Sequence, residues 1–558
     1  MAFTTIILLS VLGAIVPALA AVKHQAKDIA TQTTFLLFCG LFVTQYILLT
    51  IYRVIIYPHF LSPMRHLPGP KNNWPLIGQF GHLLRASSPN ELQIEWGNTW
   101  STTPFIRYLS LANEETLLIN TPEAHKEVFQ THCYAFQKPD VLFRFIGEII
   151  GRGLLFAEGA EHKRQRRILY ELFSMPNLKK LMPVFQEAAA GLAEHVDGML
   201  GGEGRGVVDV MECFSKMALD LTGLTVVGVE LENLKTNDPK IDFLKCFKRI
   251  FQPSALSALI SFINTQVPIR RWIPLEANYG YIRATKEVRR LLLECVRQRI
   301  IDIDRANEKN ETFAAVELPG SGRDLLTIMV QERWKVNKMA GDVLNEEDIV
   351  NQLLTFLVAG HETSAGNSTW AVYCLATHPE IQETLRAEIM DYIEQTQGAT
   401  QQWSDIDKLP YLNNFCREVL RRYCPSLATY REPTTDLTLC GTFIPKGTPL
   451  LFMPAVANLS KATWGEDSED VVPERWDRLA GDAATPYAFE TFGNGPRVCI
   501  GKNFAMMEFK TQVIELVRRF RFEKSPQLEA LGDAPPAMMN PAISLWPRDG
   551  MPVAVVRL

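Results

Sequence analysis

The stretch that most constrains the fold runs from Asn345 to His378, where the sequence predicts one long helix that is apolar on nearly every side. Asn345 and Asp348 can form a capping pair at its start, and Pro379 ends it. At about 1.5 Å per residue, some thirty residues span roughly 50 Å, which is enough to cross a large domain. A helix without a polar face has to be buried, so we expect it to run through the interior of the protein.

The middle of this helix, AGHETS over residues 359–364, interrupts the apolar pattern. Gly360 costs about 1 kcal/mol in a helix interior, and Glu362, Thr363 and Ser364 are polar groups in a predicted core. Gly360 removes a side chain where another group can press against the helix, and Thr363 can bond to its own backbone. A water-filled kink is the alternative to a functional site here.

A second informative stretch is FGNGPRVCIG, from Phe492 to Gly501, which places Cys499 among glycines and two residues after Arg497. Glycines let a flat cofactor approach the backbone closely. The sequence that follows, KNFAMMEFKTQVIELVRRF, predicts an amphipathic helix whose N-terminal dipole and free amides favour a negative sulfur. Cys499 is therefore a candidate metal ligand, although a cysteine is more often a small buried apolar side chain.

Length and composition exclude several classes of protein. The chain has 558 residues and no internal linker, which predicts one large catalytic domain behind a membrane-directed N-terminus. The net charge of -5 gives no overall basic surface for nucleic acid. The ten cysteines include no C-x-x-C pair, which argues against a zinc site, a c-type haem attachment or a disulfide framework, and favours a reducing compartment.

Two apolar runs near the N-terminus predict a membrane anchor over residues 1–56. Residues 34–52 carry no charge and have spanning length. Residues 5–21 are shorter and resemble either a second span, which we favour, or a removed signal peptide. A stiff, proline-rich hinge over 57–75 follows, and its basic residues suit a cytoplasmic face. The catalytic domain is then expected over 76–558.

Other charged residues stand at helical spacing. In EHKRQRRILYELFS, His162 and Arg166 lie four residues apart and can reach one partner. In YLNNFCREVLRRY, Glu418 and Arg421 lie three apart, which alone indicates a surface pair. The segment TYREPTTDLTLCGTFIPKGTPLLFMP alternates like hairpin strands with a turn at residues 446–447.

In the order and spacing of these motifs the chain resembles a cytochrome P-450, a haem-thiolate monooxygenase, from about Leu67 onward. FGNGPRVCIG fits the family's cysteine loop, F-x-x-G-x-R-x-C-x-G, and AGHETS fits its oxygen-activating helix. The family's E-x-x-R occurs at Glu418 and Arg421, and PERW supplies Arg475. The resemblance implies a mainly α-helical fold with a small β-rich region, in which haem b lies between the long helix and the helix after Cys499.

The resemblance also implies roles for single residues. Cys499 would be the axial thiolate of the haem iron, which favours O-O cleavage, while Glu362 and Thr363 would guide protons. Arginine suits a haem propionate because its guanidinium binds carboxylate with two hydrogen bonds; His162 stands where the family usually has a tryptophan. The implied haem contacts besides the thiolate are Arg497, Arg166, Arg431, His162, Ala359, Gly360, Phe492 and Gly501. A buried charge network, formed by Glu418, Arg421 and Arg475, would fix the loop before the cysteine.

The implied activity is insertion of one oxygen atom from O2 into an apolar small molecule, with substrate contacts at Phe143, Phe145 and residues 354–358 and 428–430. The overall pattern resembles fungal members that act on terpenoids or polyketides in secondary metabolism. We expect no flavin or nicotinamide domain before Leu558, so electrons would come from a separate NADPH-cytochrome reductase. Its candidate basic docking residues are Lys163, Arg164 and Lys502.

The expected location is the endoplasmic reticulum membrane, with the catalytic domain facing the cytoplasm. Two other functions stay open. A haem-thiolate isomerase or dehydratase would need no external electrons, and a non-catalytic haem-binding protein would need neither electrons nor substrate. The presence of Glu362 and Thr363 argues against the isomerase or dehydratase.

Overall fold

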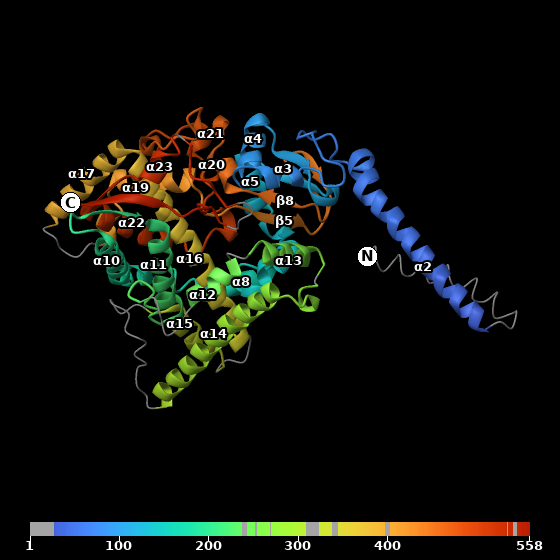
Figure 1. The fold of residues 1–558 in the computed structure, drawn as a ribbon, viewed down its shortest axis with the longest axis horizontal. Coiled ribbons are helices and arrows are strands. Elements are labelled where there is room, and N and C mark those ends of the chain that lie inside the picture. Colours follow the sequence, from blue (N-terminus) through green and yellow to red (C-terminus); the bar gives the residue numbers. More distant parts are fainter. Residues whose placement is uncertain are drawn as a thin grey trace. The chain divides into compact units, whose positions relative to one another are not determined.

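The computed structural model describes residues 27–236, 243–251, 254–267, 269–308, 323–337, 344–396, 402–532, 534–539 and 544–558. The candidate first span, 5–21, lies outside them. The described chain is mostly helical with small sheets, which confirms the expected fold class (Figure 1). It divides into two compact units, one with the described residues up to Arg85 plus Phe105–Leu118, the other with Ala86–Pro104 and Ile119–Leu558.

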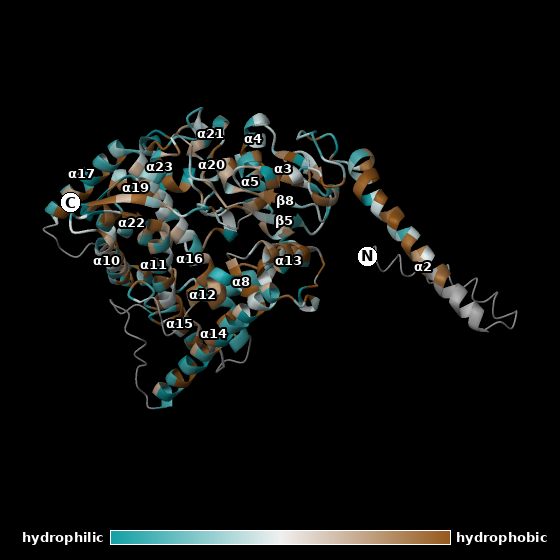
Figure 2. Cartoon of the chain, in the orientation of Figure 1, coloured by the Kyte–Doolittle hydropathy of each residue, from teal (hydrophilic) through white to brown (hydrophobic). Residues whose placement is uncertain are grey.

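The first unit contains an apolar helix in the region where the sequence predicted a span. Helix α2, Lys27–Ile51, continues into the π-type helix η1, Tyr52–Leu61. The stretch Cys39–Leu61 is long and apolar enough to cross a membrane, and most of its coloured part is hydrophobic in Figure 2. Helical structure therefore extends past the predicted end at residue 52 and includes Pro58, which a wide π turn tolerates because its hydrogen bonding is already irregular.

Two hydrogen bonds hold the end of this helix within its unit. The Asn113 side chain donates to the Val54 carbonyl at 2.8 Å, and Arg107 donates to the Pro58 carbonyl at 2.5 Å. Arg107 also pairs with Glu115 at 2.6 Å. These residues belong to or flank two short strands, β1 (Phe105–Leu109) and β2 (Glu115–Ile119).

The long helix of the second unit is α16, Glu346–Thr377, as the sequence predicted. The Asn345 side chain accepts from the Asp348 amide at 2.8 Å, and the Asp348 carboxylate accepts from the Asn345 amide at 3.2 Å. This reciprocal capping box satisfies two of the otherwise unpaired amides of the first turn. The prediction of a capped, largely buried helix is confirmed.

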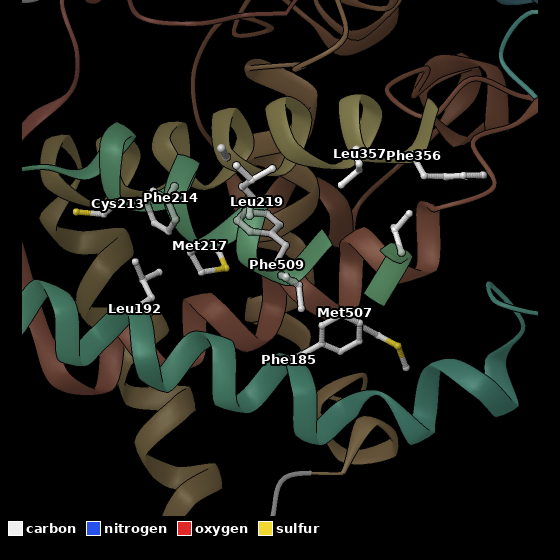
Figure 3. Close-up of a cluster of buried hydrophobic side chains, with 14 of the residues drawn as sticks. Phe185, Leu192, Cys213, Phe214, Met217, Leu219, Phe356, Leu357, Met507 and Phe509 are labelled. Atoms are coloured by element: carbon white, nitrogen blue, oxygen red, sulfur yellow. The ribbon is translucent and has the colours of Figure 1, made fainter. Parts of the chain in front are cut away.

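Helices α10 (Met182–Met199), α11 (Val210–Thr222) and α22 (Lys502–Arg519) pack around α16 or against one another. Figure 3 shows their apolar side chains converging on one core, including Phe185, Met217, Leu357 and Phe509. Fully burying each such side chain stabilises the fold by about 1.5–3 kcal/mol. This core fixes the distance between α16 and α22, the two helices that border the site described below.

Further helices of the second unit are α4 (Glu91–Thr99), α8 (Gly159–Leu169), α12 (Phe243–Phe251), α13 (Ala255–Gln266), α14 (Glu276–Glu308), α15 (Leu325–Asn337), α17 (Pro379–Gln395) and α19 (Pro410–Arg422). Its strands include β3 (Phe136–Gln137), β4 (Arg205–Asp209), β5 (Thr429–Pro433), β6 (Leu437–Leu439), β7 (Thr442–Ile444), β8 (Leu450–Phe452), β9 (Phe520–Lys524) and β10 (Pro552–Arg557).

The strands of the second unit pair in antiparallel register. β5 lies between β3 and β8, with Arg431 opposite Leu450, and β10 lies between β4 and β9. The predicted turn at residues 446–447 lies between β7 and β8. A tighter turn that the sequence reasoning missed joins β6 to β7, where Cys440 and Gly441 both adopt positive φ, of 45° and 73°.

Candidate functional site

The buried interior of the second unit opens at two places. Helix α16 is buried throughout residues 349–358, yet Ala359 is exposed and Glu362, Thr363 and Ser364 are partly exposed. The loop before α22 is similarly open, and Cys499 is the exposed member of the ten cysteines. A small pocket, with about 40 Å³ of space for the centres of water-sized molecules, is lined by residues of both regions, including Thr363, Phe492 and Ala505.

The backbone around Cys499 is shaped by hydrogen bonds and glycines. The Cys499 amide donates to the Phe492 carbonyl at 2.8 Å, which closes the loop. Gly495 adopts a φ of +70°, and a Cβ there would lie 2.0 Å from the Phe129 carbonyl oxygen, so no other residue fits. At Gly501 a Cβ would lie only 3.9 Å from the Cys499 sulfur.

The electrostatic setting of Cys499 contains opposing effects. Burial raises the pKa of the thiol, while the Gly501 amide, Arg166 and Lys502 act to lower it. The side chain is nevertheless exposed. The amides of Gly501 and Lys502 at the start of α22 point toward it, as a thiolate ligand requires.

A cluster of cations lies beside this loop, and its charge is not balanced. It comprises Lys138, Arg166, Arg431 and Arg497, and among the described residues the Glu158 carboxylate forms ion pairs with Lys138 and Arg497. Arg497 pairs with Glu158 and donates to the Ala157 carbonyl at 2.9 Å, and Lys138 lies 3.4 Å from Glu158. The buried Nε of Arg497 has no partner.

The pKa values of this cluster reflect the excess of positive charge. Burial, with Arg431 as the next cause, lowers the pKa of Lys138 to about 7, and burial with Arg497 lowers that of Arg431 to about 10. Burial and four neighbouring cations lower the pKa of His162 to about 3, so this imidazole is neutral, and its Nδ1 lies 3.3 Å from the Tyr134 hydroxyl. Such a cluster is completed by added carboxylates. The two propionates of a haem fit that requirement. The exposed sulfur of Cys499 and the space beside it are further features that suit a haem.

The Glu418 network is complete without any ligand. Arg421 donates twice to the Glu418 carboxylate, at 2.9 and 2.8 Å, and both side chains are fully buried. Arg475 and Trp476 donate to the same carboxylate at 3.3 and 3.0 Å. The remaining donors of Arg421 reach the carbonyls of Asn458, Ser468 and Asp470.

This network connects to the cysteine loop through Thr491, the residue before Phe492. The Thr491 hydroxyl donates to the Leu420 carbonyl at 2.8 Å and accepts from Asn458 at 2.8 Å. Asn458 in turn donates to the Arg421 carbonyl at 3.3 Å. Helix α19 is thus bonded directly to the start of the loop, which supports a structural role for the charged triad.

The polar residues in the middle of α16 have separate partners. The Thr363 hydroxyl donates to the Ala359 carbonyl at 2.5 Å. The Glu362 carboxylate accepts from the Ser544 hydroxyl at 3.0 Å, and burial raises its pKa to about 7, so it can hold a proton near neutral pH. Both residues therefore have the chemistry that proton transfer requires.

The structure identifies the group that presses against the helix at Gly360. A Cβ at this position would lie 2.7 Å from the Thr222 methyl group of α11, so close packing of two helices already explains the glycine. A role for Gly360 in making room for oxygen or substrate is not needed to account for it. Ala359, next to it, is the exposed residue.

The other residues that the sequence predicted to contact the substrate or the reductase do not form one group. Residues 354–358 are buried in α16, Phe143 packs edge-on against Phe156 at 5.2 Å, and Phe145 is exposed. Lys163 lies over the Tyr134 ring at 4.3 Å and Lys502 lies 5.8 Å from the Phe492 ring centre. Sequence reasoning missed Lys138 and Glu158, which belong to no motif; only the fold brings them to Arg497.

Comparisons with known proteins agree with this site. A helical fold with an accessible cysteine beneath a long central helix, and an unbalanced cluster of cations beside it, has the features of a haem-thiolate protein. The family model described as cytochrome P-450 matches residues 68–545. The chain belongs to the cytochrome P-450 family, and it is an oxidoreductase that incorporates oxygen and carries haem with a thiolate ligand.

Its relatives include fungal monooxygenases. It is 31% identical to the cytochrome P-450 monooxygenase FUM15 of Gibberella moniliformis, over 85% of both chains. It is 32% identical to the cytochrome P-450 monooxygenase sphH of Aspergillus fumigatus, over 90% of both chains. It is 28% identical to the cytochrome P-450 monooxygenase buaD of Petromyces alliaceus, over 89% of this chain and 88% of the relative.

Proposed function

We propose that this protein is a membrane-anchored monooxygenase in which Cys499 is the axial thiolate of haem b. The observation that carries this assignment is the accessible sulfur of Cys499, toward which the first amides of α22 point. Bound haem would supply the chemistry that activates O2. Phe492 and Gly501 flank the ligand in the loop, and Ala359 faces the same interior from α16.

The cation cluster would hold the haem through its propionates. Arg497 has an unpaired buried Nε, and Arg431 is buried with few partners, so each can donate to an added carboxylate. Arg166 acts on the Cys499 sulfur electrostatically. His162, neutral and beside Tyr134, can donate one further hydrogen bond. Glu418, Arg421 and Arg475 would keep the cysteine loop rigid without touching the cofactor.

Glu362 and Thr363 would hold and transfer protons on the α16 side of the site. Glu362 can release a proton from its carboxyl group near neutral pH, and Thr363 can hold a water at its hydroxyl oxygen while its hydrogen bonds to Ala359. Thr363→Ala should therefore leave NADPH oxidation running while more of the consumed O2 ends as hydrogen peroxide. Equal amounts of peroxide from both proteins would remove Thr363 from this role.

The electrons would come from a separate NADPH-cytochrome reductase. Lys163 and Lys502 are exposed on the side of the cysteine loop, while Arg164 is paired with Glu161 at 2.7 Å. The two lysines are therefore the stronger candidates of the three for docking the reductase.

We propose that residues 1–56 form the membrane anchor, that residues 57–75 connect it to the catalytic domain, and that residues 76–558 form this domain. The catalytic domain would lie at the cytoplasmic face of the endoplasmic reticulum.

The substrate class that fits best is an apolar small molecule, of terpenoid or polyketide type in secondary metabolism. Apolar side chains in residues 354–358 and at Phe143 and Phe145 support an apolar substrate, and the fungal relatives support this direction. The test is incubation of the full-length protein with a purified reductase, NADPH and a panel of apolar terpenoids and polyketides. Oxygenated products that require NADPH are expected, and none from Cys499→Ala.

A reductase-independent isomerase or dehydratase is the competing function. It would convert a peroxide substrate at the same rate with and without NADPH. If the rate of product formation does not depend on NADPH or on the reductase, the isomerase or dehydratase activity is favoured over the monooxygenase activity.

A further inference from the structure

A buried acid, Glu490, lies just before the cysteine loop, and the site described above does not use it. Its side chain is fully buried, and neither carboxyl oxygen has a hydrogen-bond partner among the described residues. Asn494 acts on this carboxyl, but its Nδ2 donates to the Pro486 carbonyl at 2.8 Å. A buried carboxylate without donors is costly, whereas the neutral acid is tolerated. The geometry therefore favours a protonated Glu490.

The main chain of Glu490 is fixed on both sides. Its amide donates to the Asn458 side-chain oxygen at 2.8 Å, and its carbonyl accepts from the Gly493 amide at 2.9 Å. Asn458 is also the residue through which the Glu418 network reaches Thr491. Glu490 therefore lies at the point where this network meets the cysteine loop.

The groups nearest in charge to Glu490 offer its ionised form no counter-ion. Among the described residues, the side chains whose pKa its charge affects are Tyr487 in η10 (Pro486–Ala488) and Cys424 after α19, and neither is a cation. Helix α20 (Pro454–Asn458) packs against η10 and contains no titratable residue. Ionisation of Glu490 would therefore place a negative charge here without an ion pair.

The charged groups of the other neighbouring elements are neutral, exposed or already paired. Helix α5 (Pro122–Lys126) packs against η10, and burial lowers the pKa of its His125 to about 3, so this imidazole is neutral. Glu123 and Lys126 of the same helix, and Asp482 before η10, are exposed. The charged residues of α19 that are not exposed are paired, Arg421 with Glu418 and Arg422 with Glu469.

The protonation of Glu490 makes the loop sensitive to pH. Burial raises the pKa of Glu490 to about 8, from an ordinary value of 4.5. The closed loop keeps a proton that an opened, solvated loop releases. The stability that this proton contributes is complete below pH 4.5 and is lost as the pH rises to about 8. Because one proton is released, each pH unit in this window favours the opened loop by up to about tenfold.

We propose that Glu490 is a positioning residue for Cys499: its neutral carboxyl keeps the start of the cysteine loop in place, and its ionisation releases the loop and the thiolate ligand with it. This inference rests on the proposed function, since it needs haem on Cys499. A Glu490 that only filled space would make the loop depend on the size of this side chain and not on its protonation.

The decisive variant is Glu490→Gln, which keeps the size of the side chain but cannot ionise. Glu490→Leu is a second neutral variant, Glu490→Asp keeps an acid, and Glu529→Gln is the control because Glu529 is exposed. The carbon monoxide difference spectrum of the reduced, full-length haem protein, in mild urea between about pH 6 and 9, gives the ratio of released to thiolate-ligated haem across the window of this ionisation.

In the wild type we expect this ratio to rise by up to about tenfold per pH unit and to level off above about pH 8. Lys138 and Glu362 titrate in the same range, so the quantity that tests Glu490 is the difference from the wild type. Glu490→Gln and Glu490→Leu should lose one proton's share of the pH dependence and keep more thiolate-ligated haem at pH 8. Glu490→Asp should keep that dependence, and the control should match the wild type.

Equal pH dependence in the wild type and in Glu490→Gln would overturn the inference. Failure of both neutral variants to load haem would overturn it as well, because the carboxyl would then be needed for more than its neutrality. A wild type without the thiolate band at any pH would instead overturn the proposed function.

Discussion

Two buried groups of charges are connected to the cysteine loop, and they differ in how completely they are paired. Around Glu418, two arginines and a tryptophan saturate one carboxylate, and the spare arginine donors reach carbonyls. Around Arg497, the Glu158 carboxylate pairs with Arg497 and Lys138 while Arg166 and Arg431 lie nearby, and one guanidinium nitrogen is left unpaired. Because buried polar groups are costly unless satisfied, the first cluster is a finished part of the fold.

The second cluster carries more positive charge than its partners among the described residues balance. A protein that keeps several buried cations beside an accessible sulfur is prepared for a negatively charged ligand, at a cost to the stability of the chain alone. In the function proposed here, the same type of residue, arginine, stabilises the fold in one place and would hold the cofactor in the other. Substitutions should separate these roles, since folding and haem binding can be measured independently.

The largest effect is expected from Arg421→Met. This substitution leaves the fully buried Glu418 carboxylate without its main partner, which typically costs about 3–5 kcal/mol. Urea unfolding of the protein should show this loss with or without haem. Arg417→Met, at an exposed position on the same helix, is the control and should change stability by less than about 0.5 kcal/mol. Equal stabilities of the two variants would mean that the Glu418 network does not hold the fold.

The second effect is expected from Arg431→Met and has the opposite pattern. Removing one cation from the unbalanced cluster should leave the protein without haem at least as stable as before. It should weaken haem binding by about 1.5–3 kcal/mol, roughly 10- to 150-fold, because a hydrogen bond to a charged group is lost. Haem titration followed by absorbance measures the affinity. A loss of stability without haem, combined with unchanged affinity, would place Arg431 with the structural group.

The third effect is expected from Glu362→Gln and concerns pH. Burial raises the pKa of Glu362 to about 7, so the proton it can donate is present below that pH and is lost as the pH rises through it. In the wild type, water formation from O2 should therefore decline above pH 7. The variant should be roughly tenfold slower at pH 6 and less dependent on pH, as follows from losing a general acid. An identical pH profile in both proteins would exclude Glu362 as the titrating group.

The smallest effect is expected from a double-mutant cycle at Gly360 and Thr222. Gly360→Ala brings a Cβ to 2.7 Å from the Thr222 methyl group, and overpacking of this kind costs about 1–3 kcal/mol, offset by about 1 kcal/mol of helix propensity. Thr222→Ala should restore the loss, with a coupling energy of about 1 kcal/mol. If the effects of the two substitutions are additive, packing against Thr222 does not explain Gly360. The glycine would then make room for the haem or its substrate.

The sequence predicted the features that local pattern determines. The capping pair at Asn345 and the apolar run behind it predicted α16 to within a residue at either end, because helix start signals and periodicity act over short distances. The overall fold class was likewise confirmed by its resemblance to a known family. Roles assigned through the cysteine loop and the AGHETS motif stay predictions, although the structure places both around one pocket.

The sequence could not predict features that depend on contacts between distant segments. Lys138 and Glu158 meet Arg497 only through the fold, 359 and 339 residues away in the chain for the two partners. Glu418 and Arg421 looked like a surface pair, because spacing reveals that two side chains meet but not that both are buried. Nor did periodicity show that the side chain of Glu508 lies in a pocket with Ser364.

The most direct test of the central claim is the carbon monoxide difference spectrum of the reduced full-length protein and of Cys499→Ala. The account predicts the absorption band characteristic of thiolate-ligated haem in the wild type and its loss in the variant, while a second cysteine substitution, Cys424→Ala, keeps the band. A wild type without that band, or a variant that retains it, would contradict the assignment of Cys499 as the haem ligand.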